Sequence, residues 1–506
     1  MILAAATLHV QITSVDWGAV LPQVITGVGA LLMLLLDVIP FPNKREILGY
    51  VAFAITVASG VAAVHLWSHG ATSAMYVTVT SDKFSVFFDY VILLSLGFAI
   101  LMSPSYIRRS AFDPGEYYAL LLFAATGMML MSAGMSFMVL FIALELLSLA
   151  LYILSGFERS RERSQEAGFK YFLLSSFASA FLIYGMALVY GATGSTNLLV
   201  INACLHGAFQ GACATGAAAN SPLLFVGIAL MAVGFAFKVS LVPFHQWTPD
   251  VYQGAPTPVT AFMSVTTKAA VFAAFIRVFN ITLGAVESKW FGIVWALSIV
   301  TMIVGNVIAL AQTNMKRLLA YSGIAHAGYI MVAVAANNNA GMSAVAFYFL
   351  AYAFMNIGAF VIVSALESRG EVGDEIASYR GLIYRSPGLT WMTTVFMFSL
   401  AGFPPTAGFI AKYVAFQAAV SAGHTELAVI GVLTSLISIY YYLRVVVYMF
   451  SSPEGERKGV FDIPNGSDIA LAAACAGAIG LGVVPWGFLN MATQAVQAMR
   501  AAFSLG

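Results

Sequence analysis

Charge is what this sequence most obviously lacks. Of its 506 residues only 9% are charged, with 23 Lys and Arg against 22 Asp and Glu, and the net charge is +1. Soluble domains carry about 25% charged residues, so this chain cannot cover a water-facing surface. A soluble enzyme, a disordered protein and a nucleic-acid-binding protein are therefore excluded. With 60% hydrophobic residues and a mean hydropathy of +0.89, the composition indicates a polytopic membrane protein.

Cysteine is equally scarce, with only Cys204, Cys213 and Cys475. The sequence contains no Cys-x-x-Cys pair and no glycine-rich motif for a dinucleotide. Iron–sulfur ligation, a zinc site and redox chemistry in this chain are therefore not expected. Cys204 and Cys213 share one loop that we expect on the outer face, where an oxidising compartment would permit a disulfide. The sequence leaves paired and free thiols both open.

Long apolar runs take the place of the missing charge. A membrane-spanning helix needs about 20 apolar residues, whereas an outer-membrane barrel would show alternating strands of about ten. The sequence therefore predicts an all-α bundle of about 14 transmembrane helices. We place them at residues 18–39, 46–67, 84–105, 116–132, 136–156, 166–191, 222–252, 257–281, 289–311, 316–336, 341–366, 388–420, 424–450 and 468–486.

The basic residues set the orientation, because cytoplasmic loops are enriched in Lys and Arg. Loops after odd-numbered segments hold fourteen of them, namely Lys44, Arg45, Arg108, Arg109, Arg159, Arg161, Arg163, Lys316, Arg317, Arg369, Arg380, Arg385, Arg457 and Lys458. Loops after even-numbered segments and the two tails hold only three, Lys83, Lys289 and Arg500. This division predicts both termini on the outer face of the membrane and the basic loops in the cytoplasm.

Two of the expected helices carry proline near their middle. Pro243 interrupts the seventh, 222–252, and Pro404 with Pro405 interrupts the twelfth, 388–420. Proline removes a backbone donor and clashes one turn back. A bilayer tolerates the resulting unwound backbone only where it is buried in protein or lines a wet cavity. A simple proline kink is the alternative for each helix, but two breaks five helices apart, entered from opposite sides, favour an inverted repeat.

The repeats divide the chain into four parts. The first three helices come before the first repeat, which comprises the fourth to eighth helices. The second, inverted repeat comprises the ninth to thirteenth helices, and the fourteenth helix and a tail follow it. The expected boundaries are 1–110, 111–285, 286–452 and 453–506.

Few ionisable residues remain inside the predicted spans. A Lys or Asp at the centre of a span costs roughly 2.5–3.5 kcal/mol on insertion scales, so such residues are retained mostly for function. Glu145 lies in mid-span, Lys238 comes shortly before Pro243, and Lys412 follows Pro404. The other ionisable residues in the spans are Asp89, Lys170, Lys268, Arg277, Arg444, His245 and His326.

Some of these residues have a structural explanation. Lys170 lies near the start of its helix, where its side chain could extend to water. Arg277 is nine residues beyond Lys268, about 180° around an α-helix, so we expect it at an interface or at the membrane surface. Asp89 is early in its helix and is expected to face an interface or a neighbouring subunit.

A row of lysines with one glutamate suits proton transfer. Burial disfavours the charged forms of both residue types, which brings their proton exchange toward neutral pH. A bound sodium ion would instead require carboxylate and carbonyl oxygens, and the central charges here are mostly lysines. His245 and His326 lie among polar neighbours, where a histidine either carries protons or serves as a hydrogen-bonded structural residue.

Three stretches of the sequence resemble a known family. They are FKVSLVPFHQWTPDVYQGAPTPVTAF at 237–262, KRLLAYSGIAHAGY at 316–329 and GFPPTAGFIAK at 402–412. They are similar to the motifs of subunit N of NADH-quinone oxidoreductase, an antiporter-like membrane subunit of respiratory complex I, and the likeness covers roughly residues 80–490. The resemblance implies a proton relay that consists of Glu145, Lys170, Lys238, His245, Lys268, His326 and Lys412.

The same resemblance implies a non-redox, proton-translocating subunit whose work is coupled to quinone reduction elsewhere. NADH, FMN, iron–sulfur clusters and quinone would be bound by partner subunits, and sister antiporter-like subunits would lie beside this chain in the bilayer. Two alternatives remain at this stage. One is a subunit of a related multisubunit cation/proton antiporter, and the other is a largely structural membrane scaffold.

Overall fold

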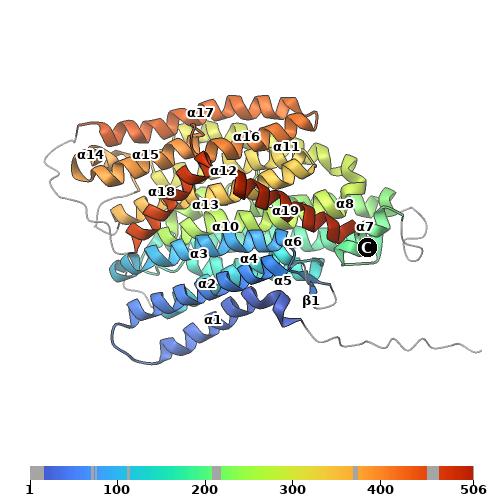
Figure 1. The fold of residues 1–506 in the computed structure, drawn as a ribbon, viewed down its shortest axis with the longest axis horizontal. Helices are drawn as coiled ribbons and strands as arrows, with labels where there is room; N and C mark the ends of the chain where they lie inside the picture. Colours follow the sequence, from blue (N-terminus) through green and yellow to red (C-terminus); the bar gives the residue numbers. More distant parts are fainter. Residues whose placement is uncertain are drawn as a thin grey trace, which may run out of the picture.

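The computed structural model describes residues 16–69, 73–74, 77–110, 114–207, 218–367, 374–452 and 466–504. Cys213, Arg369, Arg457 and Lys458, which were predicted to lie in loops, fall outside these residues. The described part is helical apart from one short antiparallel pair, β1 (Ser73–Ala74) with β2 (Val79–Thr80), and isolated bridges. Most of the long helices lie roughly side by side along the longest axis of the molecule (Figure 1).

The described residues contain 11 helices long and apolar enough to cross a membrane, or 12 if the bent pair α18–α19 counts as one span. The prediction of a polytopic α-helical membrane protein is therefore confirmed. The helices are η1 (Trp17–Val20), α1 (Leu21–Val38), α2 (Lys44–His69), α3 (Lys83–Ser110), α4 (Pro114–Ala133), α5 (Phe137–Ser155), α6 (Glu162–Thr193), α7 (Leu198–Leu205), η2 (Ala218–Asn220), α8 (Pro222–Lys238), α9 (Trp247–Gly254), α10 (Thr257–Phe275), the π-helix η3 (Ile276–Thr282), η4 (Gly284–Val286), α11 (Glu287–Leu310), α12 (Met315–Ala335), α13 (Asn339–Glu367), η5 (Ile376–Tyr379), α14 (Leu382–Arg385), α15 (Pro387–Ala401), α16 (Ala407–Ser421), α17 (Thr425–Phe450), α18 (Ser467–Val483) and α19 (Trp486–Ser504).

The structure interrupts both helices that carry the predicted breaks. One gap separates α8 from α9 and contains Pro243, and the other separates α15 from α16 and contains Pro404 and Pro405. A third break was not predicted. The chain turns by 84° between α18 and α19, so the expected C-terminal tail is a helix that packs against α3 and α13. Pro485, directly before α19, explains this break because proline cannot continue the preceding helix.

Arg277 corrects one expectation. It was predicted at an interface or the membrane surface, but its side chain is fully buried and pairs with Asp82 at 2.7 Å. The count around the helix was misleading for two reasons. The span Thr257–Thr282 is buried on every side, so the face opposite Lys268 is also protein interior. In addition, Arg277 lies in the π-helix η3, where the angle per residue differs from that of an α-helix.

The predictions for Asp89 and Lys316 were also wrong. Asp89, expected at an interface or a neighbouring subunit, is 1% exposed and accepts a hydrogen bond from the Gln23 amide at 3.3 Å. Helices α2, α4 and α10 pack against α3, which carries Asp89. Lys316, counted among the loop residues, is fully buried and pairs with Glu367 at 2.6 Å. A lysine at the start of a helix can therefore point inward when a buried carboxylate stands opposite.

The gap between α15 and α16 is covered by α18 at Gly482. A Cβ at this position would lie 2.2 Å from the Pro405 carbonyl oxygen and 2.5 Å from Thr406, and those backbone atoms cannot move without moving the break. We therefore expect Gly482→Ala to lower the stability of the folded chain by about 1–3 kcal/mol, as overpacking does. Gly480→Ala is the matched control on the same helix, since no atom of the described residues lies within 4 Å of its Cβ position. Thermal unfolding of the detergent-solubilised protein measures both, and equal midpoints would contradict this packing.

Candidate functional site

Lys238 is the last residue of α8 and lies in a cage of neutral oxygens. Its side chain is 1% exposed, and the Nζ atom donates to Ser148 Oγ at 2.7 Å, to Ser175 Oγ at 2.5 Å and to Tyr152 Oη at 3.4 Å. A hydroxyl group can donate as well as accept. The cage can therefore satisfy Lys238 both as an ammonium and as a neutral amine, which is what a proton-carrying site requires.

Glu145 lies one turn before this cage on α5. Ser148 and Tyr152 follow it by three and seven residues, so all three share one face of the helix. The carboxylate acts electrostatically on Lys238, but no ion pair joins the two among the described residues, and Glu145 Oε1 is buried without a hydrogen-bond partner. Glu145 is therefore placed to influence the charge of Lys238 without fixing it.

Lys268 lies at the centre of α10 and is 2% exposed. Its Nζ atom donates to the Gly323 carbonyl oxygen on α12 at 2.8 Å. A Cβ at Gly323 would stand 3.0 Å from that Nζ atom and 2.9 Å from the Tyr352 hydroxyl, so glycine leaves room for the ammonium group. Because a neutral amine still has two N–H bonds, the carbonyl partner is satisfied in either protonation state.

His326 lies between Lys268 and Lys412, and the charges of both lysines act on it. Its Nδ1 atom is 2.6 Å from the Tyr348 hydroxyl, and its Nε2 atom is 3.3 Å from the Tyr442 hydroxyl. Both tyrosines can donate or accept, so the ring can hold its proton on either nitrogen. The sequence left open whether His326 is a proton carrier or a structural residue, and its two hydroxyl partners suit a carrier.

Lys412 lies on α16, just beyond the second break. Its Nζ atom donates to the Ala401 carbonyl oxygen at 2.9 Å, one of the carbonyls that the interruption of the helix leaves without an intrahelical partner. Gly402 follows with φ +92°, and a Cβ there would lie 3.3 Å from the same Nζ atom. Glycine is favoured at this φ, and it also keeps the lysine's position free. The Tyr329 ring centroid is 5.0 Å from the ammonium group.

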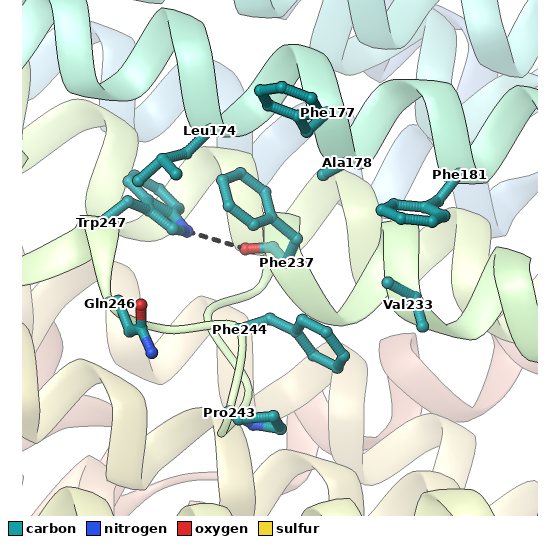
Figure 2. A pocket seen from close by; sticks show the side chains of 10 residues that line it. All are labelled: Leu174, Phe177, Ala178, Phe181, Val233, Phe237, Pro243, Phe244, Gln246 and Trp247. Carbon is teal, nitrogen blue, oxygen red and sulfur yellow. Dashed lines mark hydrogen bonds between the residues drawn. The ribbon is translucent and has the colours of Figure 1, made fainter.

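The first break is closed in an analogous way. The Trp247 indole N–H donates to the Phe237 carbonyl oxygen at 3.0 Å, and the Val242 amide donates to Thr301 Oγ1 at 3.0 Å. Figure 2 shows the bond from Trp247 to Phe237 beside an apolar pocket between α6 and α8. Its lining is Leu174, Phe177, Ala178, Phe181, Val233, Phe237, Pro243, Phe244, Gln246 and Trp247. At each break a side chain binds a carbonyl at the end of the interrupted helix, and a lysine lies next to it.

Aromatic side chains separate the Lys238 cage from Lys268. The rings of Tyr152 and Tyr171 are 4.9 Å apart, Tyr171 stacks on Trp247 at 4.5 Å, and Trp247 is 6.4 Å from Tyr252. Lys268 Nζ lies 6.0 Å from the Tyr252 ring centroid. The site therefore consists of two polar clusters with aromatic side chains between them. Lys238 lies in the first cluster, and Lys268, His326 and Lys412 lie in the second.

Two of the predicted site residues lie apart from these clusters. Lys170 is 38% exposed and pairs with Glu166 at 2.6 Å and with Asp250 at 2.8 Å. Asp250 also binds Arg317 at 2.7 Å. His245, in the first gap, is half-buried, and its Nδ1 atom has no hydrogen-bond partner in the part of the chain that the structure describes.

The hydroxyl groups around the lysines were not predicted. Ser148 and Tyr152 could have been found from their helical spacing to Glu145, and Tyr348 and Tyr352 are likewise four residues apart on one face of α13. Ser175 carries no such signal, because single serines are frequent in membrane helices and only the fold brings this one to Lys238.

Clusters of metal-ligating residues and the cysteines were the other candidates for chemistry in this chain. No group of three or more His, Cys, Asp or Glu side chains in the described ranges could hold a metal ion. Cys204 is disulfide-bonded and Cys475 is a free thiol, which decides for Cys204 what the sequence had left open.

A buried lysine lies beside each of two broken helices in this multi-pass membrane protein. The family described as NADH:quinone oxidoreductase/Mrp antiporter, transmembrane, matches residues 133–438. The NADH-quinone oxidoreductase subunit N of Trichlorobacter lovleyi is 44% identical over 485 residues, covering 96% of this chain and 98% of that protein. The subunit N of Myxococcus xanthus is 40% identical over 512 residues, covering 95% and 97%. The chain belongs to this family, and within it to the subunit N group.

Solved structures agree with this assignment. A chain of respiratory complex I from Thermus thermophilus with bound aureothin is 34% identical, with a TM-score of 0.77 over 93% of this chain and 98% of that one. A chain of the Mrp complex from Dietzia sp. has a TM-score of 0.78 at 22% identity, over 94% of this chain and 97% of that one. The second likeness concerns the fold alone.

Proposed function

We propose that this chain is a proton-translocating, non-redox membrane subunit of NADH-quinone oxidoreductase. Its protons move through Glu145, Lys170, Lys238, His245, Lys268, His326 and Lys412. One observation carries the proposal. Lys238, Lys268 and Lys412 are all buried, and among the described residues each donates only to hydroxyl or carbonyl oxygens. A lysine kept only for packing would be expected to have a carboxylate partner, as the buried Arg277 and Lys316 do.

The mechanism follows from repulsion between neighbouring sites. A proton that arrives on Lys268 disfavours a second charge on His326, and a charged Lys412 does the same from the other side. Protonation states along the row are therefore coupled, and a change at one end can release a proton at the other. On the Lys238 side, Glu145 supplies the opposite charge that can favour or release the ammonium form. Lys170, paired with Glu166 and Asp250, receives or supplies protons at the surface.

The proposed architecture has 14 spans, in which α8–α9, α15–α16 and α18–α19 each count as one. The two inverted five-helix repeats are α4–α10 and α11–α17, within the boundaries 111–285 and 286–452. Residues 1–110 and 453–506 flank them. The distribution of basic residues favours both termini on the outer face of a bacterial cytoplasmic membrane.

The chain has no redox role of its own in this proposal. NADH, FMN, iron–sulfur clusters and quinone are bound by partner subunits, and quinone reduction there drives the changes of charge in this one. Sister antiporter-like subunits and lipid surround the chain. A subunit of a multisubunit cation/proton antiporter is the second candidate, favoured by the shared fold with the Mrp complex.

One experiment separates the two candidates. The complex is extracted in mild detergent, and its mass, flavin and iron content are measured, together with transport in vesicles with and without sodium. We expect this chain to purify with a flavin- and iron-containing assembly, and NADH-driven proton transport to be unchanged without sodium. Sodium-dependent transport by an assembly free of flavin and iron would refute the proposal and favour the antiporter.

A further inference from the structure

A buried acidic cluster lies at the cytoplasmic end of α13, outside the relay described above. The Glu367 carboxylate is 2.6 Å from Lys316 Nζ and accepts a hydrogen bond from Thr257 Oγ1 at 2.5 Å. The negative charge of Asp374 also acts on Glu367. A buried carboxyl group beside a second acid can take up a proton, because like charges disfavour two ionised forms.

Asp374 is the first residue after α13 that the structure describes. Burial raises the pKa of Asp374, but the charge of Lys316, the interaction with Glu367 and the charges of Arg161 and Arg163 outweigh it, so the pKa lies below its ordinary value. Asp374 is partly exposed, whereas Glu367 is buried. Asp374 therefore connects the buried Glu367 to the surface.

A stripe of polar residues leads from Glu367 toward Lys268. On α10 it consists of Thr257, Thr260, Ser264, Thr267 and Lys268, and on α13 of Glu367, Ser364, Asn356 and Tyr352. Two hydrogen bonds fix the antiparallel register, from Thr257 to Glu367 and from the Asn356 amide to Ser264 Oγ at 2.7 Å. The same register brings Tyr352 opposite Lys268. Eleven residues separate the ends of the α10 stripe, a rise of about 16 Å.

The stripe contains several buried polar atoms that lack a hydrogen-bond partner among the described residues. They are Thr267 Oγ1, Tyr352 Oη, Asn356 Oδ1 and Ser364 Oγ. Buried polar groups are almost always satisfied, by protein or by ordered water. Four unsatisfied groups along one helix interface are therefore suited to hold a short chain of water.

We propose that Glu367 is the proton-loading group of a cytoplasmic entry route, which runs between α10 and α13 and delivers protons to Lys268. This inference rests on the proposed function and its orientation. A proton from the cytoplasm binds the Asp374–Glu367 pair, passes along the hydroxyl and amide groups, and reaches the Lys268 amine. Each transfer breaks one O–H or N–H bond and forms another, so no further reactant is needed.

One apolar side chain interrupts the stripe. Phe360 lies between Ser364 and Asn356 on the same face of α13, is fully buried, and its ring centroid is 6.5 Å from that of Tyr252. Hydroxyl and amide groups stand on both sides of it. Phe360 is therefore the apolar residue that a proton has to pass between the two polar parts of the stripe.

The test uses Glu367→Gln in the assembled complex, in inside-out vesicles whose cytoplasmic face meets the medium. Glutamine keeps the shape and accepts from Thr257 but cannot carry the proton. We expect proton translocation at alkaline medium pH to fall about tenfold or more, and the loss to shrink as the medium is acidified, because protons then reach the route without the loading group. The groups that face Glu367 are Lys316, Thr257, Asp374, Tyr379, Tyr106 and Arg161.

Three controls make the result decisive. Glu375→Gln makes the same chemical change at an exposed neighbour and should leave transport unchanged. Lys316→Met combined with Glu367→Gln avoids an unpaired buried lysine, so it should fold and show the same pH-dependent loss. Lys268→Met tests the proposed function itself. Two results would refute the entry route alone. In the first, Lys268→Met abolishes transport and Glu367→Gln transports normally. In the second, Lys268→Met abolishes transport and Glu367→Gln loses the same fraction of transport at every pH. If neither variant affects transport, the proposed function fails as well.

Discussion

Replacing Lys238 by methionine is expected to reduce proton movement through this chain by at least about 100-fold, the usual contribution of a positioned proton-transfer group. Methionine is similar in length and apolar, so it can fill the buried space that the lysine stem occupies. It cannot bind a proton, and Ser148, Ser175 and Tyr152 lose their common partner. Acidification of inside-out vesicles on addition of NADH measures the effect. The proton transport that remains should be no more than the part carried by other subunits.

Two neighbouring serines on α6 provide a matched control for this result. Ser175 is buried and accepts from Lys238 at 2.5 Å, whereas Ser176 is exposed and donates to the Phe172 carbonyl oxygen of its own helix. Ser175→Ala should slow transport by removing one of the oxygens around Lys238, and Ser176→Ala should not. Equal rates for the two serine variants would mean that the hydroxyl cage is not part of the path.

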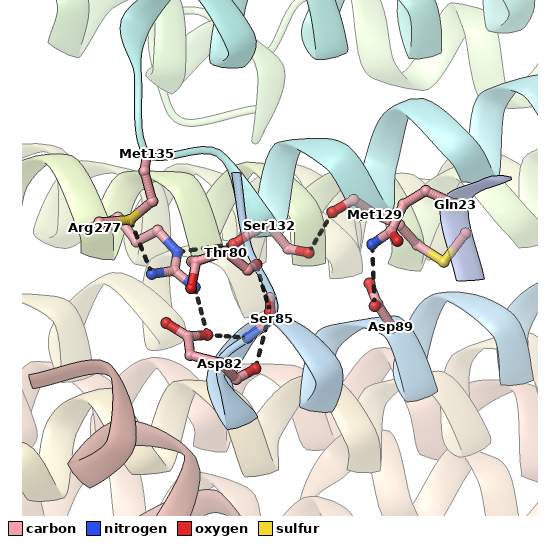
Figure 3. Close-up of polar contacts among 9 residues, drawn as sticks. All are labelled: Gln23, Thr80, Asp82, Ser85, Asp89, Met129, Ser132, Met135 and Arg277. Carbon is pink, nitrogen blue, oxygen red and sulfur yellow. Dashed lines mark hydrogen bonds and ion pairs between the residues drawn. The ribbon is translucent and has the colours of Figure 1, made fainter. Parts of the chain in front are cut away.

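Replacing Arg277 by methionine is expected to destabilise the chain by about 3–5 kcal/mol, because it leaves a buried carboxylate without its partner. Arg277 and Asp82 are both completely buried, at 2.7 Å from each other, and the guanidinium also donates to the Ser132 carbonyl oxygen at 2.8 Å. As Figure 3 shows, these contacts join the start of α3 to the end of α4 and to η3. The thermal unfolding midpoint of the purified complex and the amount of this subunit in membranes both measure the loss.

A double variant, Arg277→Met with Asp82→Asn, also removes the charge of the buried Asp82 carboxylate. Asp82 accepts from the Ser85 amide at 2.8 Å and so begins α3, a role that asparagine can take over. Arg277→Met with Asp82→Asn should therefore recover most of the stability lost in the single variant. If the double variant were as unstable as Arg277→Met alone, packing of the guanidinium, and not its charge, would explain the effect.

The lysines beside the two breaks were predictable because charge and mid-helix proline are both rare in this sequence. A rare residue inside an apolar run stands out, and its place in a broken helix can be read from spacing. The residues around each lysine cannot be predicted in this way. Serine and tyrosine are ordinary residues in membrane helices, and only the fold brings Ser175 and Tyr348 to their partners. The same holds for the acidic cluster, because Glu367 and Asp374 lie near a predicted helix end, where acids usually face water.

Arg277, Asp89 and Lys316 show where sequence reasoning failed. Angular position around a helix says which residues lie opposite one another, but it does not say which side is protein. In this chain the span Thr257–Thr282 is enclosed completely, so a side chain on any of its faces lies among protein groups. The partners Asp82 and Glu367 come from segments that are distant along the chain, and no local pattern links them to their cations.

The number of protons moved per electron tests the central claim most directly. It is measured in vesicles that contain the assembled complex, with Lys238→Met and Glu145→Ala compared with the unchanged chain. The account predicts fewer protons per electron in whatever turnover remains. An unchanged ratio at an unchanged rate of electron transfer would contradict it, and would leave the buried lysines with a structural role only.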